Sequence, residues 1–241
     1  MRKPEFITAK EAVDRIKSGS TICTIGMTLV SACESILKEL ENRFLETGSP
    51  NQLTYMHTCG QSDRKAGAVF HLAHEGLTKR IIGGHWGLCP KMMELISANK
   101  VEAYNLPQGQ MANMFHSTAL REPGKISKVG LGTFIDPRIE GGKMNDRTKP
   151  LEDIVDVVEI DGEEYLRYRE IPIDTLLIRG TYADENGNIS TQEEAMVLEL
   201  LPAVMATKRF GGQVICQVKK VVKAGTISPK EVVVPGVLVD A

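Results

Sequence analysis

Hydrophobic residues in the first fifty positions alternate between a helical and a strand-like spacing. Residues 7–19, ITAKEAVDRIKSG, carry apolar side chains at helical intervals. Thr8 and Glu11 have the spacing of a capping box, and Gly19 is a typical helix stop. The apolar run 20–26, STICTIG, follows and predicts a strand.

The same alternation continues along the chain. Residues 31–44, SACESILKELENRF, predict a second helix, with Ser31 and Glu34 as its capping box. Four further strand-like runs are LTYMHTCG (53–60), KRIIGGHWG (79–87), VEAYNLPQG (101–109) and SKVGLGTF (127–134). Because segments of helical composition separate them, we predict an α/β fold with an open, mainly parallel sheet flanked by helices.

Each predicted strand ends in glycine with small or polar neighbours. These residues are Gly26, Gly60, Gly83, Gly84 with His85, Gln108, Gly109, Gly130 and Gly132. Ligands of open parallel sheets bind outside the carboxyl ends of the strands. The set therefore suggests a shared cleft, although a turn explains any single glycine equally well and His85 alone is better explained as a brace for its loop.

Two further segments have the sequence pattern of a β-hairpin. Asp161-Gly162 lies between two alternating runs, and Asn186-Gly187 is a strong type I′ signal. Residues 193–212 then predict a helix that continues through Pro202. The strand predicted after it contains KKVVK, whose lysines are typical of an exposed strand face.

Composition limits the class of protein. The 241 residues fit a single domain (1–241), and a net charge of −2 with a pI near 6.2 provides no basic field for nucleic acid. No apolar run is long enough to cross a membrane, and no secretory signal is evident, so we expect a soluble, cytoplasmic protein. The five cysteines form no CxxC pair, which argues against disulfides and zinc.

Three motifs need a separate interpretation. VGLGTFIDPR (129–138) has two glycines at dinucleotide-binding spacing, but it lacks the third and runs into Asp136-Pro137 instead of a helix. His71 and His74 in HLAHEG match no metalloprotease order, so a packing role is favoured and no metal site is predicted. Gln108 offers amide donors where a strand meets a helix, but in isolation it is better explained as a turn or cap residue.

Several strings together resemble the family I coenzyme A transferases. They are AHEGLTKRIIGGHWG, AYNLPQG, KVGLGTFIDPRIEGGKMND, LIRGTYADENGNIS and VVKAGTISPKEVVVPG. The resemblance covers residues 7–240 and is closest to bacterial acetate or propionate CoA-transferases. It implies a ribose-5-phosphate-isomerase-like fold in which this chain is the N-terminal, α-type half.

The resemblance also implies a chemistry. A glutamate of the complementary C-terminal half or β-type subunit would carry CoA as a thioester in a ping-pong exchange between an acyl-CoA and a short-chain carboxylate, with no other bound cofactor. Gln108 falls on the family's oxyanion-contacting glutamine. The substrate-binding set it implies is Gly26, Gly60, Gly109, Gly130, Gly132, Thr133 and Phe134.

One segment departs from the family pattern. GMTLVSACES (26–35) carries Met27 and Leu29 where relatives have a glycine-richer turn, so this edge of the pocket is expected to be remodelled. Two alternatives therefore stay open: a binding or regulatory module for acyl-CoA or sugar phosphates, and an acyl-CoA hydrolase. An unpaired half would expose an apolar face, which favours a homo-oligomer.

Overall fold

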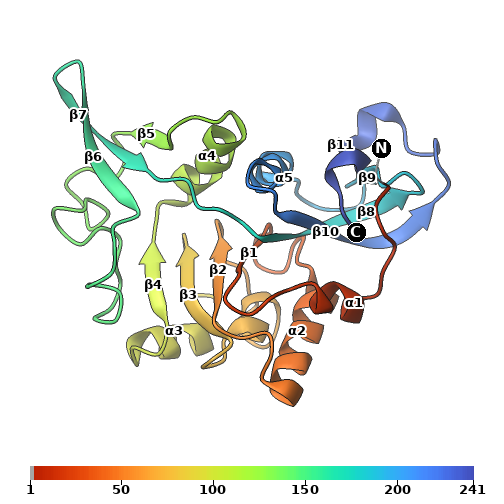
Figure 1. Ribbon diagram of the computed structural model, residues 1–241, viewed down its shortest axis with the longest axis horizontal. Helices are drawn as coiled ribbons and strands as arrows, with labels where there is room; N and C mark the ends of the chain where they lie inside the picture. Colours follow the sequence, from red (N-terminus) through yellow and green to blue (C-terminus); the bar gives the residue numbers. More distant parts are fainter. Residues whose placement is uncertain (1–2) are drawn as a thin grey trace.

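A central, mainly parallel sheet organises the chain. The computed structural model describes residues 3–241 and contains an eight-stranded sheet in the order β11-β9-β8-β1-β2-β3-β4, with β10 paired to β8 (Figure 1). Its strands are β1 (Thr21–Thr24), β2 (Leu53–His57), β3 (Thr78–Gly83), β4 (Glu102–Asn105), β8 (Thr175–Asp184), β9 (Ile189–Ser190), β10 (Gln213–Val222) and β11 (Val232–Val234). Only the pairs β8–β9 and β9–β11 are antiparallel, so the predicted α/β class is confirmed.

Both faces of the parallel strands are buried. Along β1, Ile22 packs into one core and Cys23 into the other, and along β2 Tyr55 and Met56 divide in the same way. Successive side chains of a strand point to opposite faces. Burial on both faces explains why these strands are nearly continuous apolar runs in the sequence.

Helices cover the sheet on two sides (Figure 1). They are α1 (Ala9–Asp14), α2 (Glu34–Thr47), α3 (Pro90–Ser97), α4 (Gln108–Ala119), α5 (Leu200–Arg209), and the 3₁₀ turns η1 (Ala68–Leu72), η2 (Pro229–Glu231) and η3 (Gly236–Leu238). One core joins α1, α2, η1 and α3 to the sheet, and the other joins α4 and α5. The pair α4 and α5 therefore shares one face.

A separate three-stranded sheet corrects the prediction for 127–134. Only β5 (Lys125–Ser127) is a strand there, and it pairs antiparallel with β7 (Glu163–Tyr168), which also pairs with β6 (Val155–Ile160). The remainder forms tight turns with φ of +97° at Gly130 and +68° at Gly132. These left-handed residues end the extended conformation, so the segment is not a fifth parallel strand.

The two predicted capping boxes have opposite outcomes. Thr8 and Glu11 form one at the start of α1, with Glu11 N–H donating to Thr8 Oγ1 at 3.2 Å and Thr8 N–H to Glu11 Oε2 at 2.7 Å. The box predicted at Ser31 and Glu34 is wrong. Ser31 donates instead to Met196 O at 3.1 Å, and α2 has Cys33 as its N-cap. The Glu34 carboxylate is held by other partners, described below.

Both hairpins are confirmed, but one turn differs from the prediction. Asp161 and Gly162 both take positive φ, as a type I′ turn requires, whereas Asn186 does not share the positive φ of Gly187. The Asp184 carboxylate accepts hydrogen bonds from backbone N–H groups of this second loop, among them Asn186 N–H at 2.9 Å. These bonds hold the loop in a turn other than type I′.

The last predicted helix is shorter than its pattern. Residues 193–199 are turns and irregular backbone, and α5 begins at Leu200. Pro202 thus lies in the first helical turn, where its missing N–H has no intrahelical partner to lose. Within residues 3–241, no helix is both long and apolar enough to cross a membrane.

The terminal segments lie together beside β8 and β10 (Figure 1). Glu5 N–H donates to Asp240 O at 2.9 Å. Pro4 covers the second hairpin, since a Cβ on Gly187 would come within 2.2 Å of Pro4 Cγ. The first and last residues described are therefore fixed to the same part of the sheet.

Candidate functional site

The carboxyl ends of β1 to β4 meet at one edge of the sheet. The loop after β1 contacts the loop after β2, because Thr28 N–H donates to Gly60 O at 2.7 Å. The Asn105 side chain, at the end of β4, donates to the carbonyls of Gly83 and Gly84 at 2.9 and 3.1 Å. The structure thus brings together the strand ends that the sequence singles out.

Gly84 allows the closest approach within this edge. A Cβ at Gly84 would lie 2.3 Å from Thr58 O and 3.1 Å from Gln108 Cβ. A side chain at this position would push apart the ends of β2 and β4. The absence of a side chain at Gly84 therefore sets the spacing between the Thr58 loop and Gln108.

This crowding predicts opposite effects for two glycines. Gly84→Ala is expected to lower the free energy of unfolding by about 1–3 kcal/mol, because overpacking forces backbone shifts. A Cβ at Gly109, in α4, would have nothing within 4 Å. Gly109→Ala is therefore expected to leave the free energy of unfolding unchanged or to raise it by up to about 1 kcal/mol. Urea unfolding of both variants checks this, and equal effects would contradict the close-approach role of Gly84.

Gln108 is the first residue of α4 and is exposed at the strand edge. Pro107 precedes it as an N-cap without a side-chain hydrogen bond. The first N–H groups of a helix have no intrahelical acceptor, so they and the Gln108 amide are donors at the same place. This arrangement can bind a carboxylate or an oxygen that gains negative charge.

Cys59 lies beside Gln108 and is mostly buried. Burial raises the pKa of its thiol, and the charge of Glu199 raises it further, while Gly60 N–H and the Gln108 side chain act in the opposite direction. The thiol therefore stays protonated at neutral pH and is a poor nucleophile. Cys59 forms part of the wall of the site.

Glu199 is a site residue that the sequence does not reveal. It directly precedes α5, and Thr58 Oγ1 donates a hydrogen bond to Glu199 Oε1. The sequence places Glu199 inside a helix, with no signal that its carboxylate reaches the end of β2. Folding brings together residues 141 positions apart.

His57 holds the loop that contains Cys59 in place. Its side chain is fully buried, and Nδ1 donates to Cys59 O at 2.6 Å. Burial lowers the pKa of His57 to about 4, so the ring is neutral at neutral pH. The neutral ring fixes the carbonyl of Cys59 without adding charge to the site.

The GLGTF loop lies next to the end of β4. Asn105 N–H donates to Gly142 O, and Gly142 N–H donates to Phe134 O, both at 2.8 Å. Gly132, Thr133 and Phe134 are exposed, and Phe134 is 40% accessible. Their contact with an acyl group stays a prediction.

Three of the glycines predicted to bind substrate are buried or crowded by neighbouring atoms. Gly26 and Gly60 are buried, and a Cβ would come within 2.8 Å of Val30 O at Gly26 and 2.6 Å of His85 Nδ1 at Gly60. A Cβ at Gly130 would meet Tyr168 Oη at 2.7 Å. A side chain would not fit at these positions. Their contact with substrate stays a prediction.

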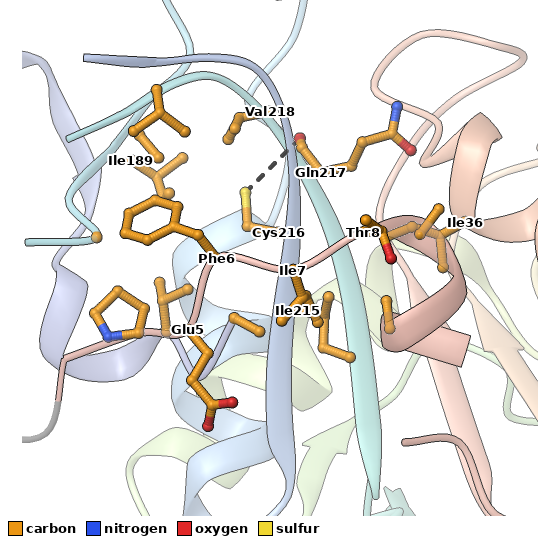
Figure 2. Close-up of a pocket in the computed structure, with 18 of the residues that line it drawn as sticks. Glu5, Phe6, Ile7, Thr8, Ile36, Ile189, Ile215, Cys216, Gln217 and Val218 are labelled. Atoms are coloured by element: carbon orange, nitrogen blue, oxygen red, sulfur yellow. Dashed lines mark hydrogen bonds between the residues drawn. The ribbon is translucent and has the colours of Figure 1, made fainter. Parts of the chain in front are cut away.

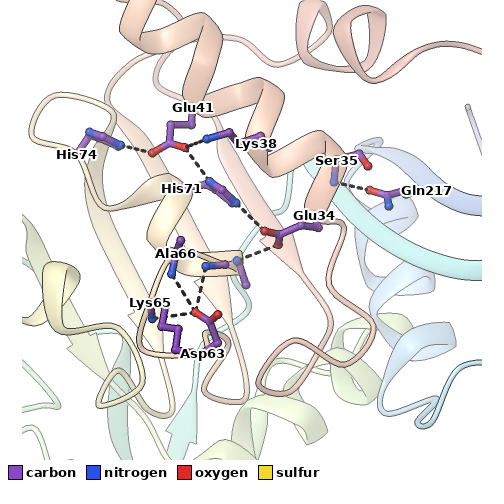
Figure 3. Close-up of polar contacts among 12 residues, drawn as sticks. Glu34, Ser35, Lys38, Glu41, Asp63, Lys65, Ala66, His71, His74 and Gln217 are labelled. Atoms are coloured by element: carbon purple, nitrogen blue, oxygen red, sulfur yellow. Dashed lines mark hydrogen bonds and ion pairs between the residues drawn. The ribbon is translucent and has the colours of Figure 1, made fainter.

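His71 and His74 have the packing role that the sequence favours. His71 is buried, with Nε2 2.8 Å from Glu34 and Nδ1 2.8 Å from Glu41 (Figure 3). His74 Nε2 lies 2.7 Å from the other oxygen of Glu41. The ring contacts both carboxylates and so links α2 to η1.

A cavity lies away from this edge. It has a volume of about 520 Å³ and lies between the N-terminal segment and β10, where Phe6, Ile7 and Ile215 line it (Figure 2). None of the predicted site residues lines it. Among residues 3–241, no group of three or more His, Cys, Asp or Glu side chains could hold a metal ion.

Comparison with known proteins identifies relatives over nearly the whole chain. The family described as coenzyme A transferase matches residues 6–241. Caffeate CoA-transferase of Acetobacterium woodii is 42% identical over 236 residues, which are 98% of this chain and 45% of that protein. Acetate CoA-transferase YdiF of Escherichia coli (strain K12) is 39% identical over 235 residues, which are 97% of this chain and 44% of that protein.

A solved structure agrees in fold. The crystal structure of the acyl-CoA transferase YdiF from E. coli O157:H7, a thioester complex with CoA, has a TM-score of 0.92 and 38% identity. The match covers 99% of this chain and 46% of that chain. The chain therefore spans about half the length of the relatives that it matches.

Proposed function

The chain belongs to the coenzyme A transferase family, and on that basis we propose that it is the N-terminal, α-type half of an acyl-CoA:carboxylate CoA-transferase. The observation that carries the proposal is the position of Gln108. The Gln108 amide and the free N–H groups of α4 lie together at the edge where parallel sheets bind ligands. Relatives about 40% identical carry the names of acetate and caffeate transferases, which favours monocarboxylates as substrates.

The proposed reaction proceeds in two half-reactions. A glutamate carboxylate of the complementary half attacks the thioester carbonyl, which forms an acyl-glutamyl anhydride and expels CoA as a thiolate. The thiolate then attacks the glutamyl carbonyl, so that a glutamyl-CoA thioester forms and the first acyl group leaves as its carboxylate. An acceptor carboxylate reverses these steps and leaves as the new acyl-CoA.

This chain would bind and polarise the reacting thioester. Gln108 would donate to the thioester oxygen as it gains negative charge, and Gly109 would add a backbone N–H from the same helix start. Gly132, Thr133 and Phe134 would form the wall against the acyl group. The buried Gly26, Gly60 and Gly130 would keep the surrounding turns tight.

An exchange assay tests this proposal. The chain together with its complementary half is expected to transfer CoA from propionyl-CoA to acetate, and after incubation with propionyl-CoA alone a glutamate of the other half should carry CoA. This chain alone should show no exchange. Loss of CoA ester without added carboxylate would indicate hydrolysis, and absence of exchange with every carboxylate would exclude the transferase.

A further inference from the structure

Glu199 brings a carboxylate to the wall of the proposed acyl site. Its side chain accepts the hydrogen bond of Thr58 Oγ1, at the end of β2. The backbone of Thr58 also lies close to Gln108, since a Cβ at Gly84 would lie 2.3 Å from Thr58 O and 3.1 Å from Gln108 Cβ. The Glu199 carboxylate and the Gln108 side chain are therefore both next to Thr58.

The two helices that carry these groups begin at the same edge. Gln108 is the first residue of α4, and Glu199 is the N-cap of α5. The helices lie on the same face of the sheet (Figure 1). Helix N-termini attract negative charge, which favours the placement of the Glu199 carboxylate at this end of α5.

The negative charge of Glu199 acts on buried groups at this edge of the sheet. Burial raises the pKa of the Cys23 thiol, and the Glu199 charge raises it further. The same two causes act on Cys59. A group bound at Gln108, next to Thr58, would experience this negative charge.

We propose that Glu199 is a specificity-determining residue that disfavours acyl groups with a second carboxylate. The inference rests on the proposed transferase function and on the hydrogen bond that holds Glu199 against Thr58, whose carbonyl lies close to Gln108. A substrate whose carbonyl oxygen is held at Gln108 would place the distal end of its acyl group near Thr58 and Glu199. Like charges repel there, whereas an uncharged acyl group has no such penalty and an ammonium group is attracted.

Thr58 acts as the positioning residue for this carboxylate. Its hydroxyl donates to Glu199 and keeps the carboxylate against the end of β2. Glutamine at position 199 keeps the side-chain shape and an oxygen that can accept from Thr58, but it removes the charge. Glu199→Gln therefore changes the field and leaves the packing of α5 in place.

The test measures kcat/KM of the complete enzyme for CoA transfer to three acceptors: propionate, succinate and β-alanine. In Glu199→Gln, transfer to succinate relative to propionate is expected to increase at least tenfold, and transfer to β-alanine relative to propionate is expected to fall several-fold. A folding defect lowers all three rates together. Opposite changes for succinate and β-alanine therefore report charge and exclude a merely structural effect.

Glu193→Gln is the matched control. Glu193 is in the same segment, but its exposed carboxylate contacts Tyr182 and Lys219, so both ratios should stay within twofold of the native enzyme. If Glu199→Gln still exchanges CoA but both acceptor ratios are unchanged, the proposed role of Glu199 is wrong, whereas the proposed transferase function stands. Absence of exchange with all acceptors, in the native enzyme and the variants, would overturn the proposed transferase function and this inference with it.

Discussion

Replacement of Gln108 by alanine is expected to lower the turnover of the complete enzyme by a factor of about 10² to 10³. This is the usual effect of removing one donor from an oxyanion hole, about 2.7–4 kcal/mol in the activation free energy. The free energy of unfolding should change by less than about 0.5 kcal/mol, because Gln108 is exposed. Steady-state CoA exchange and urea unfolding measure the two effects separately.

The control for this variant lies on the same helix. Asn113 is also an exposed amide side chain of α4, and it donates only to Gly109 O, at 2.8 Å. Asn113→Ala should retain turnover within about twofold. If Gln108→Ala exchanges CoA as fast as Asn113→Ala, Gln108 does not contact the reacting oxygen.

Replacement of His71 by alanine is expected to lower the free energy of unfolding by about 3–5 kcal/mol. The variant removes the ring that contacts both carboxylates, and it leaves a cavity in a buried position. Only 5% of the His71 side chain is exposed, and it contacts both Glu34 and Glu41. His116, which is exposed in the last turn of α4, provides the histidine control and should change stability by less than about 0.5 kcal/mol.

The same network predicts a pH dependence. Burial would raise the pKa of Glu41, but hydrogen bonds from His74, His71 and Lys38 outweigh it and lower the pKa from 4.5 to about 2. A lowered carboxyl pKa stabilises the fold above the unfolded value of 4.5, and this contribution is lost as the pH falls from 4.5 toward 2.

Acid titration of the two histidine variants checks this sign. In His71→Ala the Glu41 carboxylate has fewer donors, so less stability remains to be lost between pH 4.5 and 2. The native chain and His116→Ala should lose more in that interval. An equally steep acid loss in all three would show that the pairing of Glu41 with His71 contributes nothing.

The strands were predictable because burial on both faces leaves a strong signal. β1 and β2 are short runs rich in β-branched, aromatic and other apolar residues, and a glycine follows soon after each strand ends. That signal also located Gln108, because a strand end followed by a helix start is a property of local sequence. The capping box at Thr8 is local for the same reason.

Long-range contacts explain what the sequence could not predict. Ser31 and Glu34 have the spacing of a capping box, but each contacts a residue distant in sequence instead. Ser31 donates to Met196 O, and Glu34 contacts His71. The GLG segment has strand-like composition, yet its glycines take left-handed conformations that end β5. Glu199 enters the site only through its contact with Thr58, for which no local pattern exists.

The joined terminal segments have a consequence for protein engineering. Because Glu5 and Asp240 are hydrogen-bonded through their backbones, a short linker could close the described chain into a ring. New ends could then be opened at Asp161-Gly162, the exposed tip of the β6–β7 hairpin, where little packing would be lost. We therefore expect a circularly permuted chain to fold, and a partner half could then be tethered to this one in either gene order.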